Sequence, residues 1–339
     1  MTVELSTSVF AGGSGAGAPR AVLLGDIGAT NARFALLVSG AIGPIAWIEV
    51  ARHPNFEDAV DALLKFEFDG LAVSDAVLAV AGPVENGRCA FTNCSWTIDG
   101  RDIRNRFAFN TVRVINDFEA TASSLPHLGD NDLHRLGKGC AVSCAPKVVL
   151  GPGSGLGVAG LVGEEGRWIV VPSEGGHATM AATTRREDAI LEHLRGRFTH
   201  VSAERVLSGP GLENLYKAIA AIDGVEAPLG NPVEITNAAL AARCPIACAA
   251  LDMFCAMLGS FAGNVALTYG ARGGVYIAGG IAPRILRYLA NSTFRQRFEQ
   301  KGRLRSYLES IPTQVIVHPT ATFLGLSSIA KAEPASGRQ

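Results

Sequence analysis

One supersecondary pattern occurs twice in this chain and limits the folds that the chain can adopt. From Ala21, an apolar run (AVLLG) leads through a polar turn (DIGATNAR) into a second apolar run (FALLV). From Lys147, the run VVLG leads through the turn PGSGLG into VAGLVG, and a third strand pattern, RWIVV, follows. Each copy is typical of a hairpin, with strand, turn and strand. The repeat predicts an internally duplicated, two-domain α/β protein with a ligand cleft between the copies.

The segments around the two hairpins alternate between strand and helix patterns. We expect further strands at residues 44–50, from residue 76, at 112–115, within 273–280 and within 313–318. We expect helices at residues 56–66, after residue 117, at 246–269 and from about residue 322, the first of them with Asn55 as its N-cap. Polar and glycine residues interrupt the apolar stretch 246–269, which favours a buried helix over a membrane span.

Charge and cysteine content exclude several classes of partner. The formal net charge is −1 and charged residues make up 18% of the chain, so the basic surplus needed to bind nucleic acid or an anionic membrane is missing. The seven cysteines are an odd number and contain no CxxC pair, which favours reduced thiols in the cytoplasm over disulfides or structural zinc. We expect residues 1–20 to form a flexible leader and residues 334–339 a disordered tail.

The turn of the first hairpin has the composition of a phosphate cradle. Asp26, Gly28, Thr30 and Asn31 combine backbone donors, a hydroxyl and an amide with a carboxylate that could hold a hydrated divalent cation. An ordinary turn would use the same residue types without any ligand, because Asp, Asn and Gly all favour turns. The turn alone leaves both interpretations open.

The turn of the second hairpin, Gly151 to Gly157, has four glycines at alternate positions. Since glycine costs backbone entropy, this density favours a closely approaching ligand over a plain loop. The turn does not match GxGxxG and precedes a strand, which disfavours a Rossmann dinucleotide site, and no GxxxxGK[ST] sequence is present.

Three further segments carry groups suited to chemistry. Asn116 and Asp117 lie where a predicted strand meets a predicted helix, a position at which α/β proteins often place reactive side chains. Glu174 and His177 flank two glycines, and Glu204 follows later in the chain. These acceptors suit a polyhydroxyl ligand, although a zinc site or a solvated surface loop would use the same residues.

Seven motifs occur in an order that resembles a known family. They are DIGATNARFA from Asp26, FTNCSW from Phe91, INDFEA from Ile115, GPGSGLGVA from Gly151, SEGGH from Ser173, ERVLSGPGL from Glu204 and GGVYIAGGIAPR from Gly273. Together they resemble the bacterial ATP-dependent glucokinase family, which has the sugar-kinase or actin-like ATPase fold. This resemblance implies two ribonuclease-H-like domains with an interdomain cleft. It implies a small α/β domain at 21–127 joined by a C-terminal helix at 318–333, and a large α/β domain at 128–317.

The resemblance also implies a role for each motif residue. Asp117 would be the general base, with Asn116 beside it, while Asn93, Glu174, His177 and Glu204 would hold the sugar. Asp26 would face Mg²⁺ through water, and Gly28, Thr30, Asn31, Gly153, Ser154 and Gly155 would contact the phosphates of ATP, with Gly279 and Gly280 near the adenosine. Two residues depart from the family pattern, since Ala29 replaces a usual glycine and Ser154 a usual threonine.

The expected function is therefore phosphoryl transfer from Mg·ATP to the 6-hydroxyl of D-glucose by a cytoplasmic homodimer without nucleic-acid or membrane partners. Two alternatives remain, a kinase for another hexose or an N-acetylated amino sugar, and a non-catalytic sugar sensor on the same scaffold. Epimeric sugars differ by one hydroxyl, so the sequence does not separate them. It also leaves open whether the phosphoryl donor is ATP, ADP or polyphosphate.

Overall fold

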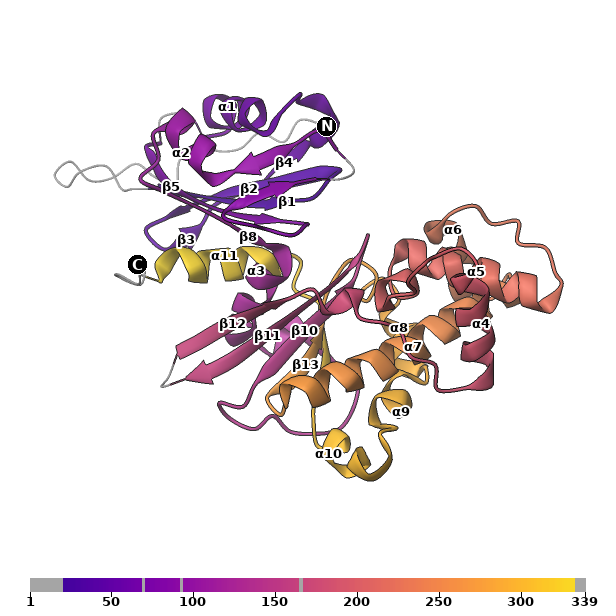
Figure 1. Ribbon diagram of the computed structural model, residues 1–339. Helices are drawn as coiled ribbons and strands as arrows, with labels where there is room; N and C mark the ends of the chain where they lie inside the picture. The colour runs from indigo at the N-terminus through magenta and orange to yellow at the C-terminus, as the bar shows by residue number, and fades with distance from the viewer. Residues whose placement is uncertain (1–20, 69–70, 92–93, 165–166, 333–339) are drawn as a thin grey trace. The chain divides into compact units, whose positions relative to one another are not determined.

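The computed structural model describes residues 21–68, 71–91, 94–164 and 167–332 (Figure 1). The expected leader at 1–20, Asn93 and the expected tail at 334–339 lie outside the described residues. The chain divides into two compact units. The first unit contains Met1–Ile115 with Ala330–Gln339, and the second contains Asn116–Ile329.

The first unit is built on a six-stranded sheet in which the predicted hairpin is central. The strand order is β3-β2-β1-β5-β8, with β4 also paired to β2, and the 21–27 strand pairs antiparallel with its hairpin partner and parallel with β5. The strands are β1 (Ala21–Ile27), β2 (Asn31–Val38), β3 (Ala41–Ile42), β4 (Ala46–Glu49), β5 (Val73–Val80) and β8 (Thr111–Asn116). A separate two-stranded sheet contains β6 (Arg88–Ala90) and β7 (Thr97–Asp99).

Helices α1 (Phe56–Phe66) and α2 (Gly100–Phe107) complete the first unit. Helix α1 begins where the sequence predicts, because the Asn55 side chain accepts a hydrogen bond from Asp58 N at 2.8 Å. Its buried residues recur at helical spacing and pack in one core with the sheet, where the Phe56 and Trp96 rings meet edge to face at 5.6 Å. The predicted strand from residue 76 begins earlier, at Val73.

The second unit repeats the same sheet topology. Its strand order is β12-β11-β10-β13-β14-β9, in which β10 pairs antiparallel with β11 and parallel with β13, as β1 does with β2 and β5. The strands are β9 (Leu133–Arg135), β10 (Lys147–Pro152), β11 (Leu156–Glu164), β12 (Arg167–Ser173), β13 (Gly274–Ile277) and β14 (Thr313–Ile316). The predicted internal duplication is therefore confirmed for the three central strands of each sheet, whose order and directions match.

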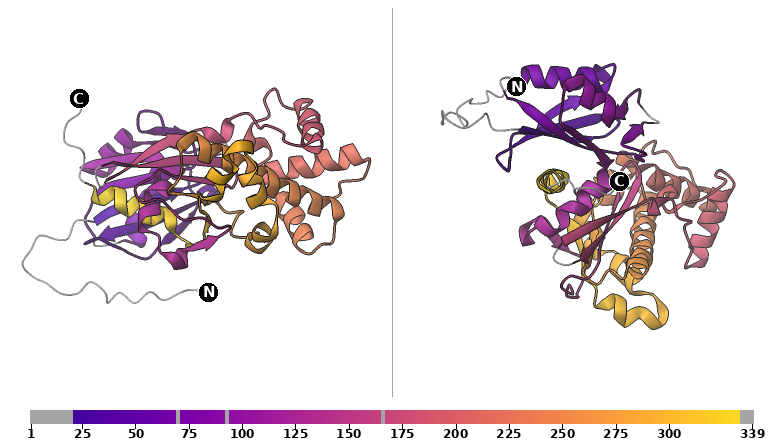
Figure 2. Two further views of the ribbon diagram at one scale, coloured as in Figure 1. Left: turned by 90° about the horizontal axis from the view of Figure 1, so that it is seen from below. Right: turned by 60° about the vertical axis from the view of Figure 1, so that its left-hand side comes forward.

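Helices cover both faces of this second sheet. Because side chains alternate along a strand, Val148 and Leu150 enter the core shared with α5 and α7, whereas Val149 between them packs with residues of α3. The helices are α3 (Asp117–Ser124), α4 (Arg185–Arg195), α5 (Gly209–Asp223), α6 (Pro232–Leu240), α7 (Pro245–Tyr269), α8 (Leu286–Asn291), α9 (Phe294–Glu299), α10 (Arg305–Glu309) and α11 (Ala321–Lys331). Figures 1 and 2 show α4, α5 and α6 gathered near one end of α7.

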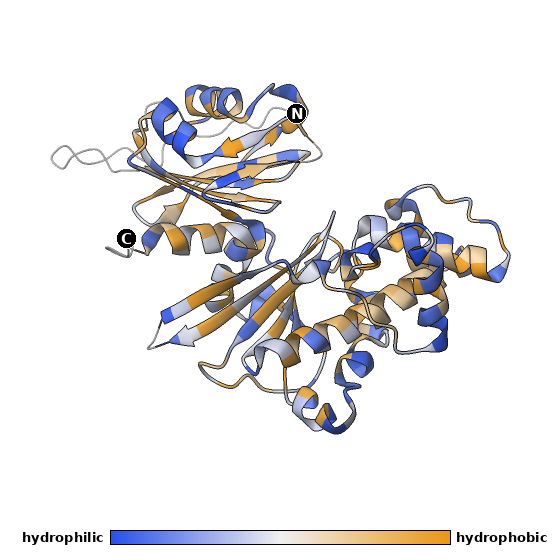
Figure 3. Ribbon diagram, viewed as in Figure 1, coloured by the Kyte–Doolittle hydropathy of each residue, from blue (hydrophilic) through white to orange (hydrophobic). Residues whose placement is uncertain are grey.

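Helix α7 is the central helix of the second unit. It is long and apolar enough by composition to cross a membrane, yet 72% of its most apolar window is buried inside the protein. Figure 3 shows apolar residues along α7 and the strands, and polar residues on α2 and α4. Gly259 and Gly263 let α9 approach closely, since a Cβ at Gly263 would lie 2.6 Å from Phe298 O. The prediction of a buried helix at 246–269 is confirmed.

The two compact units and the predicted domains differ in where they assign α3 and α11. Helix α3 packs against β10, β11 and β12, and Gly325 of α11 lies directly on the backbone of Ala120 in α3. Both contacts explain why all of α3 and most of α11 fall into the second unit. The domain limits predicted at residues 127 and 317 remain a prediction.

Candidate active site

The glycine-rich hairpin of the second unit is the point at which several predicted site segments meet. Gly151 pairs with Gly157 and Pro152 with Leu156, so residues 153–155 form the turn between β10 and β11. Gly153 N donates to Gly155 O at 2.8 Å, which closes the turn tightly. The carbonyl of Gly153 accepts from Gly209 N at 2.8 Å, at the start of α5. The turn is therefore a fixed structure and not a loose loop.

The structure gives a new reason for three of its four alternate glycines. A Cβ at Gly157 would overlap the ring of Phe118, and one at Gly151 would lie 2.7 Å from Cζ of the same ring. A Cβ at Gly155 would lie 2.5 Å from Oε2 of Glu204. Only at Gly153 does the surrounding space stay open, with no described atom within 4 Å. Sequence reasoning attributed this glycine density to an approaching ligand, but protein side chains occupy most of the space.

Asp117 lies at the junction between β8 and α3, as predicted. Asn116 is the N-cap of α3, and its Oδ1 accepts from Phe118 N at 2.8 Å. Asp117 Oδ1 accepts from the same N–H at 2.9 Å. One backbone donor therefore orients both side chains, and both residues are half-buried. The Phe118 ring packs on the glycine-rich hairpin, so the residue whose N–H donates to Asp117 is in contact with that hairpin.

The predicted sugar residues of the second unit lie on two segments that are joined by backbone hydrogen bonds. Met180 N donates to Val201 O at 3.0 Å, and Ala203 N donates to Ala178 O at 2.8 Å. Glu174 precedes the single helical turn Gly175–His177 and His177 ends it, and both are exposed, whereas Glu204 follows the connection and is half-buried.

Both sugar segments also reach the second hairpin. Glu204 Oε2 accepts from Leu156 N at 2.9 Å. Gly176 lies so close to Leu156 O that a Cβ there would overlap this oxygen. The structure thus brings Glu204 and the Glu174–His177 turn to the same hairpin as Gly153, Ser154 and Gly155.

Gly279 and Gly280 follow β13 and continue along the same hairpin. Ala278 N donates to Leu150 O at 2.8 Å and Ile281 N to Pro152 O at 3.3 Å, so the segment between them runs beside the end of β10. Gly279 has φ +81° and is packed on the backbone of Pro152, which only glycine allows without strain. Gly280 has no described atom within 4 Å of a Cβ position and is exposed.

The first hairpin, in the first unit, carries the remaining predicted residues. Gly28 N donates to Asn31 O at 3.0 Å, and Thr30 O accepts from Val50 N at 3.0 Å, so this turn is also fixed by its own backbone. Asp26 forms an ion pair with Arg33, its partner across the strands. Sequence reasoning missed Arg33, although the hairpin register would have placed it opposite Asp26.

Phe118 and Leu156 were missed as well. Phe118 is apolar and Leu156 acts through its backbone N–H, so neither carries a chemical signature in the sequence.

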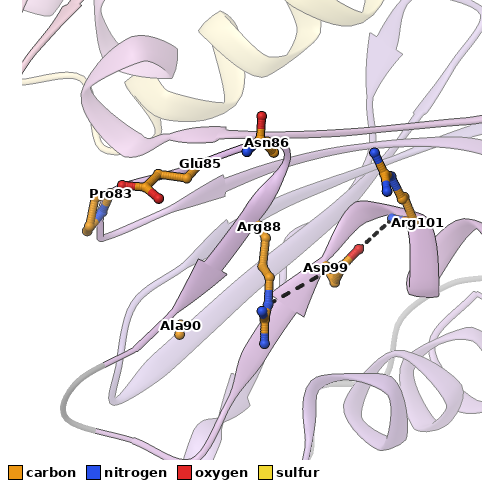
Figure 4. Close-up of a pocket in the computed structure, with 7 residues that line it drawn as sticks. All are labelled: Pro83, Glu85, Asn86, Arg88, Ala90, Asp99 and Arg101. Carbon is orange, nitrogen blue, oxygen red and sulfur yellow. Dashed lines mark hydrogen bonds and ion pairs between the residues drawn. The ribbon is translucent and has the colours of Figure 1, made fainter.

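A pocket of about 600 Å³ lies elsewhere in the first unit, beside β6, β7 and the start of α2 (Figure 4). Its lining contains two arginines and two carboxylates, of which Arg88 Nε and Asp99 Oδ2 are 4.0 Å apart. None of the predicted site residues that the structure describes is among the residues lining it: Pro83, Glu85, Asn86, Arg88, Ala90, Asp99 and Arg101. We therefore assign it no part in the predicted chemistry.

Comparison with known proteins assigns the chain to a family. A family model described as glucokinase matches residues 23–333. The chain is 43% identical over 311 residues to a glucokinase of Paramagnetospirillum magneticum, covering 91% of this chain and 97% of the relative. It is 41% identical to a glucokinase of Nitrobacter hamburgensis, covering 91% and 96%. It is also 42% identical to a bifunctional protein glk of Paraburkholderia xenovorans, of which it spans 53%.

Solved structures agree with this assignment. The crystal structure of a glucokinase from an Antarctic psychrotroph matches with a TM-score of 0.82 at 36% identity, covering 91% of this chain and 98% of that chain. A ROK family glucokinase from Streptomyces griseus, in complex with glucose and AMPPNP, matches with a TM-score of 0.62 at 19% identity and covers 91% and 98%, which shows a shared fold. The predicted actin-like ATPase fold of sugar kinases is confirmed. Given a family match over almost the whole described chain, this protein belongs to the glucokinase family.

Proposed function

We propose that this protein is an ATP-dependent hexose kinase that transfers the γ-phosphoryl group of Mg·ATP to the 6-hydroxyl of D-glucose, giving glucose 6-phosphate and ADP. The observation that carries the proposal is the family match over residues 23–333, which includes all seven motifs. The position of Asp117 at the end of β8 supports it, because phosphoryl transfer needs a group that orients the attacking hydroxyl.

Asp117 would act as the general base. As the 6-hydroxyl oxygen bonds to the γ-phosphorus and the bond from this phosphorus to the leaving ADP oxygen breaks, the hydroxyl proton passes to the Asp117 carboxylate. The shared hydrogen bonds from Phe118 N hold Asn116 and Asp117 in one arrangement before substrate binds. Such preorganisation lowers the entropy lost on reaching the reactive geometry.

The sugar would be held by Asn93, Glu174, His177 and Glu204. Carboxylates accept hydrogen bonds from hydroxyl groups, and such charge-assisted bonds are stronger than neutral ones. Glu174 and His177 are exposed on a short turn, so their side chains are available to a ligand. Asn93 lies outside the described residues, so its role depends on the motif alone.

The phosphates of ATP would lie against Gly28, Thr30 and Asn31 of the first hairpin and Gly153, Ser154 and Gly155 of the second, with Gly279 and Gly280 near the adenosine. Asp26 is suited to Mg²⁺, which retains several waters and needs few protein carboxylates. Arg33 contacts Asp26 Oδ2, and Oδ1 has no hydrogen-bond partner among the described residues, so one oxygen can face a hydrated ion. Bound Mg²⁺ would neutralise charge on the phosphates.

A coupled assay of ADP release tests the proposal. Purified protein with Mg·ATP is assayed against glucose, mannose, fructose, galactose and N-acetylated amino sugars, with Asp117→Asn as the matched control. Glucose should give the highest kcat/KM. A higher kcat/KM for another sugar would show that this sugar, and not glucose, is the preferred substrate. A glucose-induced thermal shift without ADP release would show that the protein is a sugar sensor. ADP and polyphosphate in place of ATP test the donor.

The proposal includes a cytoplasmic homodimer without nucleic-acid or membrane partners. The near-neutral charge of −1 supports the lack of anionic polymer partners, and the described cysteines, which form no disulfide bonds with one another, support the compartment. Light scattering coupled to gel filtration measures the mass in solution, and a mass equal to one chain would exclude the dimer.

A further inference from the structure

The Glu204 side chain contacts the hairpin that carries the proposed phosphate site. Its Oε2 accepts from Leu156 N at 2.9 Å, and it fills the space beside Gly155, where a Cβ would lie 2.5 Å from Oε2 and 3.4 Å from Cδ. Its other oxygen, Oε1, has no hydrogen-bond partner among the described residues. One carboxylate therefore has one oxygen on the hairpin and the other available to a ligand.

Several contacts fix the backbone of Glu204, so its side chain can hold the hairpin in place. Ser208, which is 2% exposed and caps α5, donates from Oγ to Glu204 O at 2.8 Å. Gly211 lies against the same carbonyl, where a Cβ would be 2.9 Å from the oxygen. Ala203 is fully buried and hydrogen-bonded to Ala178 O. These contacts fix the backbone from which the carboxylate reaches the hairpin.

We infer that Glu204 has two roles: it is a sugar ligand, as the proposed function requires, and it is a positioning residue that sets the geometry of the hairpin for the nucleotide. The second role rests on the proposed function only in taking this hairpin as the phosphate site. The bond to Leu156 N is charge-assisted, and removing the acceptor leaves a backbone N–H without its partner. Loss of Glu204 should therefore weaken nucleotide binding even when no sugar is present.

Two substitutions of Glu204 separate its roles. Gln keeps an oxygen acceptor for Leu156 N but loses the charge, whereas Ala loses both. Calorimetry with Mg·ADP and no sugar should show that Glu204→Ala weakens binding by about tenfold or more. Glu204→Gln, which keeps an acceptor for Leu156 N, should bind Mg·ADP more tightly than Glu204→Ala. Thermal melting and circular dichroism identify the folded variants, and an equal ADP affinity of wild type and folded Glu204→Ala would overturn the inference.

A second test perturbs Glu204 from the side of the hairpin, with a glycine outside the site as the control. Gly155→Ala pushes a methyl group against Glu204 Oε2, while a Cβ in Gly230→Ala would meet only Glu234 Oε2, at 4.0 Å. In glucose calorimetry without nucleotide, Gly155→Ala should bind about tenfold more weakly, and Gly230→Ala should bind as the wild type does. If the two variants bind glucose with equal affinity, the inference that the Glu204 side chain contacts both the hairpin and the sugar is contradicted.

The two experiments also distinguish failure of the inference from failure of the proposed function. If the wild-type protein does not bind or phosphorylate glucose, the role of Glu204 as a sugar ligand is refuted. The calorimetry with Mg·ADP still decides whether Glu204 positions the hairpin. If glucose is phosphorylated normally and Glu204→Ala changes only glucose binding, the proposed function stands and the positioning role is refuted.

Discussion

Gly157→Ala is expected to damage catalysis by displacing Phe118, an apolar residue outside the proposed set of substrate ligands. The added methyl group would overlap the Phe118 ring, which also lies within 2.7 Å of a Cβ position at Gly151. The ring has to move, and its own backbone N–H holds the side chains of Asn116 and Asp117. A shift of the ring is therefore transmitted over one residue to the proposed general base.

The size of the effect follows from packing and from geometry. Adding a methyl group to a filled site typically costs about 1–3 kcal/mol, which for a domain of this size lowers Tm by roughly 2–12 °C. A misplacement of a catalytic group by about 1 Å can cost about 100-fold in rate. We expect kcat to fall by about 10- to 100-fold, with a smaller change in KM for glucose.

The assay compares kcat, KM and Tm of three variants. Gly230→Ala is the control for a glycine substitution as such, because a Cβ there would meet only Glu234 Oε2, at 4.0 Å; its Tm and kcat should match the wild type. Phe118→Ala combined with Gly157→Ala removes the three ring atoms that the methyl group would overlap, Cγ, Cδ2 and Cε2, and should recover part of kcat. A wild-type kcat in Gly157→Ala, or a double variant no better than the single one, would refute the reasoning.

Four further outcomes are expected. Asp117→Asn should lower kcat by at least about 10² with the glucose-induced thermal shift retained, and a near-normal kcat would end its assignment as base. Asp26→Ala should weaken Mg²⁺-dependent activity but leave glucose affinity, measured by calorimetry without nucleotide, nearly unchanged. Glu187→Ala should reduce the free energy of unfolding in urea by about 3–5 kcal/mol, because it leaves Arg297, now 2.6 Å from the buried carboxylate, without its partner. Burial raises the pKa of Cys255 from 9.0 to about 12, so the folded protein retains a proton that the unfolded chain loses, and the free energy of unfolding should fall as pH rises from about 9. Cys255→Ala should make this fall less steep but should not abolish it, because burial also raises the pKa of Cys248, Tyr276 and Tyr288.

Features that depend on neighbouring residues could be predicted from the sequence. Asn55 caps its helix and Asn116 caps the next, because a polar residue before an apolar helical pattern is a local signal. The two hairpins and the buried helix at 246–269 follow from periodicity. The duplication was recognisable because both copies retain the same order of strand and turn.

Features that depend on contacts between distant segments could not be predicted in this way. The pairing of β9 with β14 joins residues that lie far apart in the chain, and nothing in either short strand specifies the other. The Glu204 carboxylate meets Leu156 N across a similar gap in sequence. Glycine density in a turn shows that something approaches the backbone, but not whether it is a ligand or a side chain of the protein.

The two copies of the duplicated hairpin differ in the source of the aromatic ring that covers it. In the first copy, Phe34 lies opposite Gly25 and supplies the ring itself, with Cε1 3.1 Å from a Cβ position at Gly25. In the second copy the corresponding pair is Gly151 and Gly157, and Phe118 from α3 fills the space. A ring within a strand stabilises only its own sheet, whereas a ring from α3 also docks that helix, and with it the proposed base, on the hairpin. Gly157 and Phe118 must therefore change together, since a bulky residue at 157 would fill the hairpin and release the helix.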